Sequence, residues 1–233
     1  MNEKITSRYD YKAKRSVEAL LNLPEPLIKI LDKAFLYEST MTSHELKTLL
    51  GCGYAGVGDP WNHDYSFGAT TVAFRFRDAM IERGFVFPTS DLLDSIDSLA
   101  GVRPVIDLAC GTGWLSGWLR KRGLDVTAVD NKSWKFSKFE KDVIKCDAVN
   151  YVKNHPNPLG IYILSWPYMN DMAARIWKAM RSGERLLYIG EGGGGCTAND
   201  EFFAVTEGCE REDVKGLYQF WGLHDYAELL TKP

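Results

Sequence analysis

The stretch from Val105 to Ser116 (VIDLACGTGWLS) constrains the fold more than any other part of the sequence. It begins as an apolar, β-branched run, a pattern typical of a strand that is buried on both faces. It continues through Gly111 to Gly113 into a segment that carries Leu115, Trp118 and Leu119 at helical spacing. Glycine lets the backbone bend sharply and lets a ligand approach without meeting a Cβ atom. A buried strand, a glycine turn and a helix form half of a nucleotide-binding unit.

Two carboxylates flank this turn and indicate what kind of ligand it would hold. A dinucleotide-binding turn would place a third glycine at position 116, where this chain has Ser116. Asp107 lies four residues before Gly111, where it would repel a phosphate and attract an amino-bearing ligand. Val126 to Asp130 has the pattern of a second buried strand, and a carboxylate at its tip can accept hydrogen bonds from both hydroxyls of a ribose. The pattern favours an adenosine that carries an amino-acid tail.

The motif from Asp107 to Gly113 (DLACGTG), followed by Ala128-Val-Asp130, resembles the cofactor site of the class I S-adenosylmethionine-dependent methyltransferases. This resemblance covers roughly the C-terminal half of the chain. It implies a doubly wound, mostly parallel seven-stranded α/β sheet and S-adenosylmethionine (SAM) as the cofactor. The cofactor-binding residues that it implies are Asp107, Ala109, Gly111, Gly113, Leu115, Asp130, Asn131, Asp147 and Ala148. A tight strand-to-helix turn without a ligand would leave the paired acids unexplained.

Asp147 and Ala148 follow the third predicted strand, which begins at Val143. In the family that the chain resembles, an acidic residue at this position often binds the adenine amino group. Asp147 also has the residue type of an N-cap for a helix over residues 148–154. The two roles are compatible.

A second informative stretch is the predicted strand from Ile161 to Ser165 and the three residues that follow it, Trp166, Pro167 and Tyr168. In position it resembles the Asn/Asp/Ser-Pro-Pro-Tyr motif of methyltransferases that modify exocyclic amines. The resemblance implies that Ser165 and the Trp166 carbonyl accept hydrogen bonds from the amine and that Tyr168 stacks on the target ring. Trp166 stands where that motif has its first proline. The alternative is a strand-to-helix turn in which Trp166 and Tyr168 pack against the preceding helices.

Three further features carry candidate chemistry at the same edge of the sheet. Glu191 precedes four glycines and would position a substrate amine or act as a base. Cys196 would act as a nucleophile only with an activating base, and the sequence shows none. Basic and aromatic residues alternate from Asn131 to Lys141, a pattern that either stacks on a base or forms a solvated connection, with Trp134 as a candidate neighbour of the adenine.

Residues 1–101 are expected to form a helical N-terminal extension that caps the cleft, and residues 102–233 the Rossmann-like methyltransferase core. Thr42 to Glu45 has the pattern of a capping box at a helix start. Glycines and aromatic residues are dense from Gly51 to Gly68, which predicts a loop that either lines the site or packs on itself. The segment from Lys215 through Phe220 to Tyr226 is expected to supply an antiparallel hairpin at the sheet edge.

Charge and cysteine usage bound the remaining possibilities. The net charge of −3 exerts no global attraction on nucleic acid, although a local basic face would suffice for it. The polar N-terminal residues and the absence of a long apolar run predict a cytoplasmic protein with no membrane partner. The five scattered cysteines predict reduced thiols, and none has metal-site spacing, so no metal site is expected.

These features predict a SAM-dependent methyltransferase whose acceptor is a planar amine, either in nucleic acid or in a small molecule. The transfer is an in-line displacement, so the protein has mainly to position two reactants. An alternative from another class is a SAM-binding protein that regulates or degrades without methylating. The sequence predicts no oligomeric state.

Overall fold

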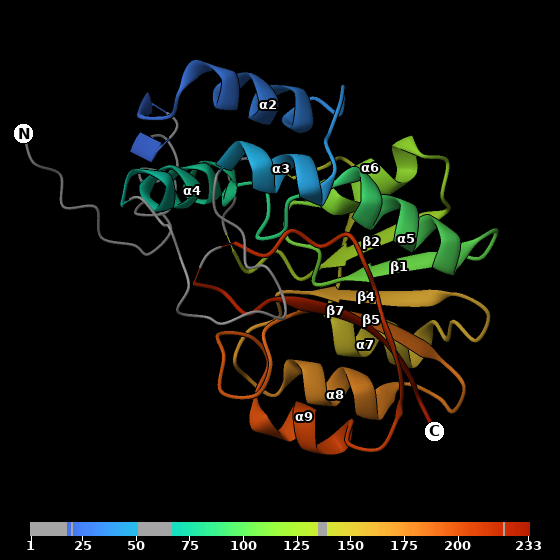
Figure 1. The fold of residues 1–233 in the computed structure, drawn as a ribbon. Helices are drawn as coiled ribbons and strands as arrows, with labels where there is room; N and C mark the ends of the chain where they lie inside the picture. Colours follow the sequence, from blue (N-terminus) through green and yellow to red (C-terminus); the bar gives the residue numbers. More distant parts are fainter. Residues whose placement is uncertain (1–17, 20, 51–66, 135–138, 221) are drawn as a thin grey trace, which may run out of the picture.

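The computed structural model describes residues 18–19, 21–50, 67–134, 139–220 and 222–233. A central sheet of seven strands carries helices on both of its faces (Figure 1). The loop expected over residues 51–68 lies outside the described residues, except that α4 begins at Phe67. Part of the basic and aromatic segment, residues 135–138, also lies outside them.

The sheet has the order β3-β2-β1-β4-β5-β7-β6. Strands β1 to β5 are parallel to one another, and β7 is antiparallel to both β5 and β6. The prediction of a mostly parallel, seven-stranded α/β sheet is therefore confirmed. The strands are β1 (Val105–Leu108), β2 (Val126–Asp130), β3 (Val143–Lys145), β4 (Ile161–Ser165), β5 (Arg185–Gly190), β6 (Glu210–Asp213) and β7 (Tyr226–Thr231).

Strand β1 lies between β2 and β4, where the strand order reverses direction. Asp107 is in register with Ala128 of β2 and with Ile163 of β4. All four β1 residues are buried, which explains why three of them are apolar and why the strand shows no alternation of apolar and polar residues. The exception is the acid Asp107. In open α/β sheets the crevice outside the carboxyl ends of the strands at such a reversal is where ligands bind.

The helices divide between the two faces of the sheet (Figure 1). The helices on one face are α2 (Glu25–Phe35), α3 (Ser43–Leu50), α4 (Phe67–Met80), α5 (Ser90–Ala100) and α6 (Trp114–Lys121). Those on the other face are α7 (Ala148–Asn154), α8 (Met172–Ala179) and α9 (Asp200–Val205). Helices that precede β1 share a hydrophobic core with the sheet, as Leu31 and Phe76 do with Ile163. The division of the chain into domains at residue 102 stays a prediction.

The capping box is present at the start of α3. The Glu45 amide donates to Thr42 Oγ1 at 3.1 Å, and the Thr42 amide donates to Glu45 Oε2 at 2.8 Å. Helix α2 is joined to α6 through Ala34, whose carbonyl oxygen accepts from the indole N–H groups of Trp114 and Trp118, each at 3.1 Å. These bonds fix α2 against the helix that follows the glycine turn.

The expected position of the antiparallel hairpin is wrong. The hairpin is formed by β6 and β7, and residues 215–220 are not in a strand. Strand β6 has the sequence Glu-Arg-Glu-Asp, and all four residues are charged and exposed. Hydrophobic patterning therefore gives no signal for it. The aromatic residues Tyr218 and Phe220 are instead buried in the hydrophobic core between the sheet and helices α2 to α6.

Candidate functional site

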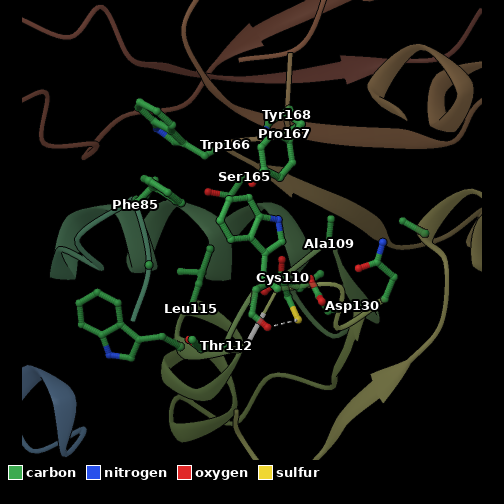
Figure 2. A pocket seen from close by; sticks show the side chains of 18 of the residues that line it. Phe85, Ala109, Cys110, Thr112, Leu115, Asp130, Ser165, Trp166, Pro167 and Tyr168 are labelled. Atoms are coloured by element: carbon green, nitrogen blue, oxygen red, sulfur yellow. Dashed lines mark hydrogen bonds between the residues drawn. The ribbon is translucent and has the colours of Figure 1, made fainter. Parts of the chain in front are cut away.

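A cavity of about 570 Å³ opens at the carboxyl ends of β1, β2 and β4 (Figure 2). It lies at the reversal of strand order, where the fold predicts a ligand site. The sequence-predicted residues that line it are Asp107, Ala109, Gly111, Leu115, Asp130, Asn131, Asp147, Ala148, Ser165, Trp166, Pro167 and Tyr168. Segments from four parts of the chain are thus brought to one place.

Gly113 is not among the residues that line the cavity. It precedes α6 with a φ of 85°, and a Cβ atom there would lie 2.7 Å from Val143 Cγ2. Glycine is needed at this position for both its left-handed backbone and its close approach to β3. Gly113 therefore supports the site by packing. Of the two glycines of this turn, Gly111, with a φ of 60°, is the one that lines the cavity.

The carboxylate of Asp130 is held by the turn that it flanks. Its Oδ2 accepts from the Gly111 amide at 3.0 Å, and its Oδ1 accepts from the Lys132 amide at 2.6 Å. Burial raises the pKa of Asp130, and these two hydrogen bonds oppose the rise. Each carboxylate oxygen has a second lone pair, so Asp130 can still accept from a pair of hydroxyls in the cavity.

Asp107 is 2 % exposed and accepts a hydrogen bond of 2.5 Å from the hydroxyl of Ser116. Ser116 thus replaces the third glycine of a dinucleotide turn with a partner for this acid. Burial raises the pKa of Asp107 to about 7, and the charge of Asp130 adds to the rise, whereas Ser116 and Arg120 oppose it. A positively charged group in the cavity would favour the ionised form of Asp107.

The third acid of the cavity, Asp147, caps α7. Its Oδ1 accepts from the Asn150 amide at 3.0 Å, which confirms the capping role. Its place in the cavity wall leaves the second role, contact with an adenine amino group, open to it. Asn131 also lines the cavity, and its Oδ1 accepts from the Ser133 amide at 2.8 Å.

The glycine turn is also held by residues that the sequence did not indicate, through hydrogen bonds to Thr112. The Thr112 hydroxyl donates to the carbonyl of Arg83, and the Thr112 carbonyl accepts from the Glu140 amide at 2.8 Å. Glu140 Oε1 in turn accepts from the hydroxyl of Tyr37 at 2.7 Å and lies 3.7 Å from Arg83 Nη1. Burial and the hydrogen bond to Glu140 raise the pKa of Tyr37. These partners are far apart in sequence, so no local pattern could reveal them.

On the β4 side of the cavity, Trp166 has a left-handed backbone with a φ of 50°. Its amide donates to the Ile189 carbonyl at 2.7 Å, and its ring stacks on Phe85 with centroids 5.2 Å apart and planes 9° apart. Figure 2 shows this pair at the end of the cavity away from Asp130. Phe85, with its neighbours Ile81 and Val86, comes from the segment before α5, which the sequence did not place at the site.

Tyr168 stacks on Trp134, with ring centroids 5.2 Å apart and planes 14° apart. Both rings line the cavity, and Tyr168 is half-exposed. The ring expected to stack on a target base therefore already contacts an aromatic neighbour. The sequence offered Trp134 as a neighbour of the adenine and Tyr168 as a neighbour of the acceptor ring. The stacked pair would therefore lie between the cofactor and the acceptor.

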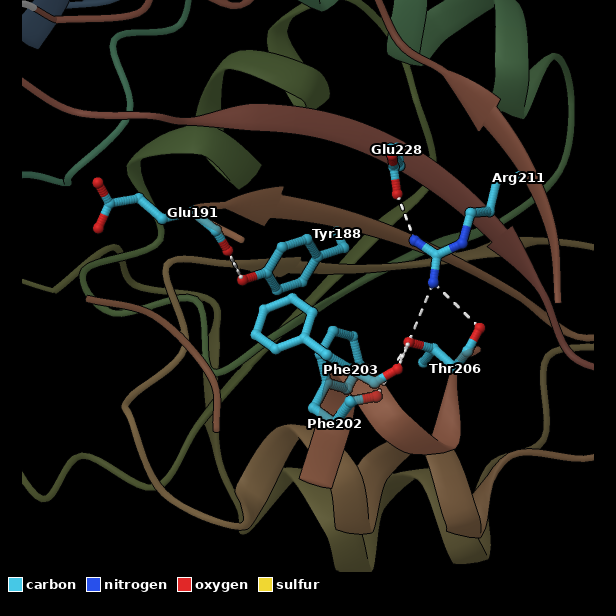
Figure 3. Close-up of polar contacts among 7 residues, drawn as sticks. All are labelled: Tyr188, Glu191, Phe202, Phe203, Thr206, Arg211 and Glu228. Carbon is cyan, nitrogen blue, oxygen red and sulfur yellow. Dashed lines mark hydrogen bonds and ion pairs between the residues drawn. The ribbon is translucent and has the colours of Figure 1, made fainter. Parts of the chain in front are cut away.

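Glu191 ties down the glycine loop that follows β5. Its Oε2 accepts from the Cys196 amide at 2.6 Å, and its Oε1 accepts from the His224 amide at 3.0 Å. The Tyr188 hydroxyl donates to its carbonyl oxygen at 2.7 Å (Figure 3). Burial alone would raise the pKa of Glu191, but the hydrogen bonds from His224 and Cys196 bring it below its usual value. This geometry favours a structural role over the predicted role of a base.

Cys196 lines the cavity, but its environment does not activate it. Burial, together with the hydrogen bond and charge of Glu191, raises the pKa of its thiol above the usual value. The thiolate is the nucleophilic form, so a raised pKa disfavours attack by this residue near neutral pH. The sequence offered Cys196 as a nucleophile only with an activating base, and Glu191, the acid beside it, has the opposite effect on its thiol.

No family model and no curated protein matches the chain. Solved structures resemble it in part. A protein from Anaeromyxobacter dehalogenans described as a candidate Type II methyltransferase is 19% identical, with a TM-score of 0.34, over 43% of this chain and 46% of that one. An rRNA methylase from Streptococcus thermophilus is 17% identical, with a TM-score of 0.39, over 60% of this chain and 93% of that one. Human N-acetylserotonin methyltransferase, solved with SAM, is 14% identical, with a TM-score of 0.41, over 94% of this chain and 67% of that one.

These TM-scores lie below 0.5, so we infer function from the residues of the cavity. Two further properties of the described residues bear on it. No helix among them is both long and apolar enough to cross a bilayer. Within the same residues, no group of three or more His, Cys, Asp or Glu side chains is arranged to hold a metal ion.

Proposed function

We propose that the protein is a SAM-dependent methyltransferase. The observation that carries the proposal is the cavity itself, in which buried acids from β1 and β2 lie on either side of the Gly111 turn. The motif from Ser165 to Tyr168 lines the same cavity from β4. A cofactor half and an acceptor half thus share one space.

The residues present fit this cofactor. Asp107 is buried with a raised pKa, and a ligand ammonium would supply a counter-charge for it. Asp130 retains lone pairs that would accept from ribose hydroxyls. Asp147 and Ala148 line the same cavity and are proposed to contact the adenine. When bound, SAM supplies an electrophilic methyl group on its sulfonium.

The chain's own residues would orient the acceptor and exclude water. Ser165 and the Trp166 carbonyl are proposed to accept hydrogen bonds from an exocyclic amine, with Tyr168 and its partner Trp134 contacting the planar ring. The Phe85–Trp166 pair forms an apolar wall at the far end. Because positioning supplies most of the required rate enhancement, no base is needed unless the nucleophile is protonated. The acceptor is thus a planar amine, in a nucleobase or in a small metabolite.

A second candidate is a SAM-binding protein that regulates or degrades without methylating. The stacking of Tyr168 on Trp134 favours it, because a target ring would have to displace or share that contact. Tight cofactor binding with no labelled product from any extract would support this second function.

Two variants test the proposal, using methyl-labelled SAM and calorimetry. Ser165→Ala is expected to lower turnover and leave the cofactor Kd unchanged, because it acts on the acceptor alone. Asp130→Ala is expected to weaken cofactor binding. Equal loss of cofactor binding in Ser165→Ala would overturn the role of Ser165. No heat with either SAM or S-adenosylhomocysteine would overturn the proposed function as a whole.

A further inference from the structure

We propose that Arg77 and Asp225 are positioning residues for the acceptor end of the cavity, because together they hold the ring and the backbone of Trp166. This inference rests on the proposed methyl transfer, in which the Trp166 carbonyl accepts a hydrogen bond from the acceptor amine. It adds to the site two residues that do not themselves line the cavity and that no motif indicated.

The backbone of Trp166 is strained where this residue enters the cavity wall. Its φ of 50° lies in the left-handed region, which a bulky side chain rarely adopts. Such a conformation costs free energy and persists only where the surrounding structure fixes it. The hydrogen bond from the Trp166 amide to the Ile189 carbonyl, at 2.7 Å, fixes the main chain on one side. The direction of the Trp166 carbonyl depends on this conformation, so the ring must be held as well.

The Trp166 ring is held by one aromatic and one cationic contact. Phe85 stacks on it, with centroids 5.2 Å apart and planes 9° apart. The guanidinium carbon of Arg77, in α4, lies 5.1 Å from the Trp166 centroid and 5.9 Å from the Phe85 centroid. A guanidinium over an aromatic face is attracted by the negative charge of that face, and more strongly when water is excluded. Arg77 therefore ties both stacked rings to helix α4.

Asp225 supplies a counter-charge for Arg77 from the residue that directly precedes β7. It is 6 % exposed, and the charge of Arg77 is the strongest influence that opposes the effect of burial on its pKa. The Trp166 indole N–H acts on the same carboxyl and also lowers its pKa. This contact is looser than a standard hydrogen bond, since within the described residues neither Trp166 Nε1 nor Asp225 Oδ1 has a partner of normal geometry. One carboxylate thus acts on both the guanidinium and the indole.

The charges around Asp225 make it depend on Arg77. His224 precedes Asp225 in the chain, and its Nδ1 lies 4.0 Å from Glu191 Oε1. Loss of Arg77 would leave the Asp225 carboxyl buried without this cation, which favours its neutral form. The two residues therefore act as a unit. Among the described residues, the other titratable groups that interact with the charge of Asp225 are Glu191, Tyr188 and Cys196.

Nuclear magnetic resonance of the isotope-labelled, full-length protein tests the arrangement through the Trp166 indole N–H. Trp166→Phe assigns its signal, which is then followed from pH 5 to pH 9. The signal is expected to shift with a midpoint near pH 7, because burial raises the pKa of Asp225 to about 7. Asp225→Asn should abolish the shift, and Arg77→Met should raise the midpoint by about one pH unit or more because a cation is lost. A signal that does not move with pH, or that moves equally in all three proteins, would overturn the inference.

His224→Gln is the matched control, because this neighbouring side chain titrates in the same range but is 72 % exposed, and the midpoint should stay unchanged. Positioning itself is measured by amide hydrogen exchange at pH 7.5. In Asp225→Asn the Trp166 amide should lose protection about tenfold or more. The Gly111 amide, which donates to Asp130 at the cofactor end, should keep its protection. Equal loss at both amides, or loss at neither, would show that Asp225 does not position Trp166.

Label transfer and calorimetry connect the pair to function. Asp225→Asn should lower transfer of methyl label from SAM to a cell extract about tenfold and leave the S-adenosylhomocysteine Kd unchanged. Unchanged transfer would overturn the positioning role. If Asp225→Asn did not fold, Arg77→Met and Arg77→Lys would decide, since the lysine keeps the charge and its midpoint should lie closer to the original. Failure of the original protein to bind S-adenosylhomocysteine would overturn the proposed function and leave the indole titration intact, so the two failures are distinguishable.

Discussion

The Gly111 amide donates to Asp130 Oδ2 at 3.0 Å, so the end of β2 holds the turn that follows β1. The same carboxylate is the proposed acceptor for the cofactor ribose. Its negative charge therefore acts on the turn and on the ligand at once, and a substitution there should affect both.

Asp130→Asn keeps the shape of the side chain and removes its charge. We expect cofactor affinity to fall about tenfold to a hundredfold, because hydrogen bonds to a charged group contribute about 1.5–3 kcal/mol. Calorimetric titration with S-adenosylhomocysteine measures this loss. The control is Asp213→Asn, an exposed aspartate at the end of β6, which should bind like the original protein. Equal affinities in all three proteins would contradict the ribose role.

The raised pKa of Asp107 predicts how stability depends on pH. In the unfolded chain an aspartate has a pKa of about 3.9, whereas burial raises the pKa of Asp107 to about 7 in the folded protein. Between these values the folded state binds more protons, so this group's contribution to stability is lost as pH rises from about 4 through 7. Asp225, whose pKa is also raised by burial to about 7, acts in the same direction.

Asp107→Asn should therefore reduce the fall in the free energy of unfolding between pH 5 and pH 8. Urea denaturation at several pH values provides the measurement. The fall should be smaller than in the original protein but still present, because Asp225 remains. An unchanged pH profile would show that Asp107 titrates with a near-normal pKa.

Gly113 and Gly123 separate backbone strain from close packing. Both have a left-handed φ, of 85° and 90°. A Cβ atom at Gly113 would lie 2.7 Å from Val143 Cγ2, whereas one at Gly123 meets nothing within 4 Å. Gly123→Ala is expected to cost about 1 kcal/mol from its backbone alone, and Gly113→Ala more than that. Denaturant unfolding compares them, and equal costs would show that Val143 moves aside freely.

Glu191→Gln tests whether this residue is a structural clamp. Only one oxygen of the amide can accept, so the loop should lose a bond to either Cys196 or His224, at a cost of about 1–3 kcal/mol. Removing the charge should also lower the pKa of the Cys196 thiol, because Glu191 is one cause of its rise. Alkylation of Cys196 by iodoacetamide at pH 8 should therefore be faster.

Peptide mass spectrometry can follow that reaction with Cys209 as an internal reference, since Glu191 is not among the causes that raise its pKa. The variant Glu207→Gln, at an exposed position after α9, should leave both rates unchanged. If Glu191→Gln abolished methyl transfer and left stability and alkylation unchanged, Glu191 would be a base after all.

The sequence predicted the parts of the fold that local pattern determines. The β-branched run of β1, the acid at the tip of β2 and the capping box of Thr42 and Glu45 all depend on residues close together in the chain. The charged strand β6 has no apolar face, and it exists because β7 offers it an edge. Patterning could not reveal a strand that depends on its partner.

The same distinction applies to the site. The motifs after β1, β2 and β4 were predicted because parallel strands bring their carboxyl ends to one edge. Phe85 and Arg83 enter the cavity from a segment that has no motif, and they are placed by packing of the helices on the sheet. Glu191 was assigned a chemical role because the sequence could not show that both of its oxygens are engaged.

Strand β7 follows β6 in the chain but lies between β6 and β5. Strand β6 therefore forms an edge of the sheet, and within the described residues no strand pairs with its outer side. A row of unpaired backbone N–H and C=O groups invites pairing with another chain, and charged side chains discourage it. The composition that hides β6 from hydrophobic patterning thus protects the molecule from association edge to edge.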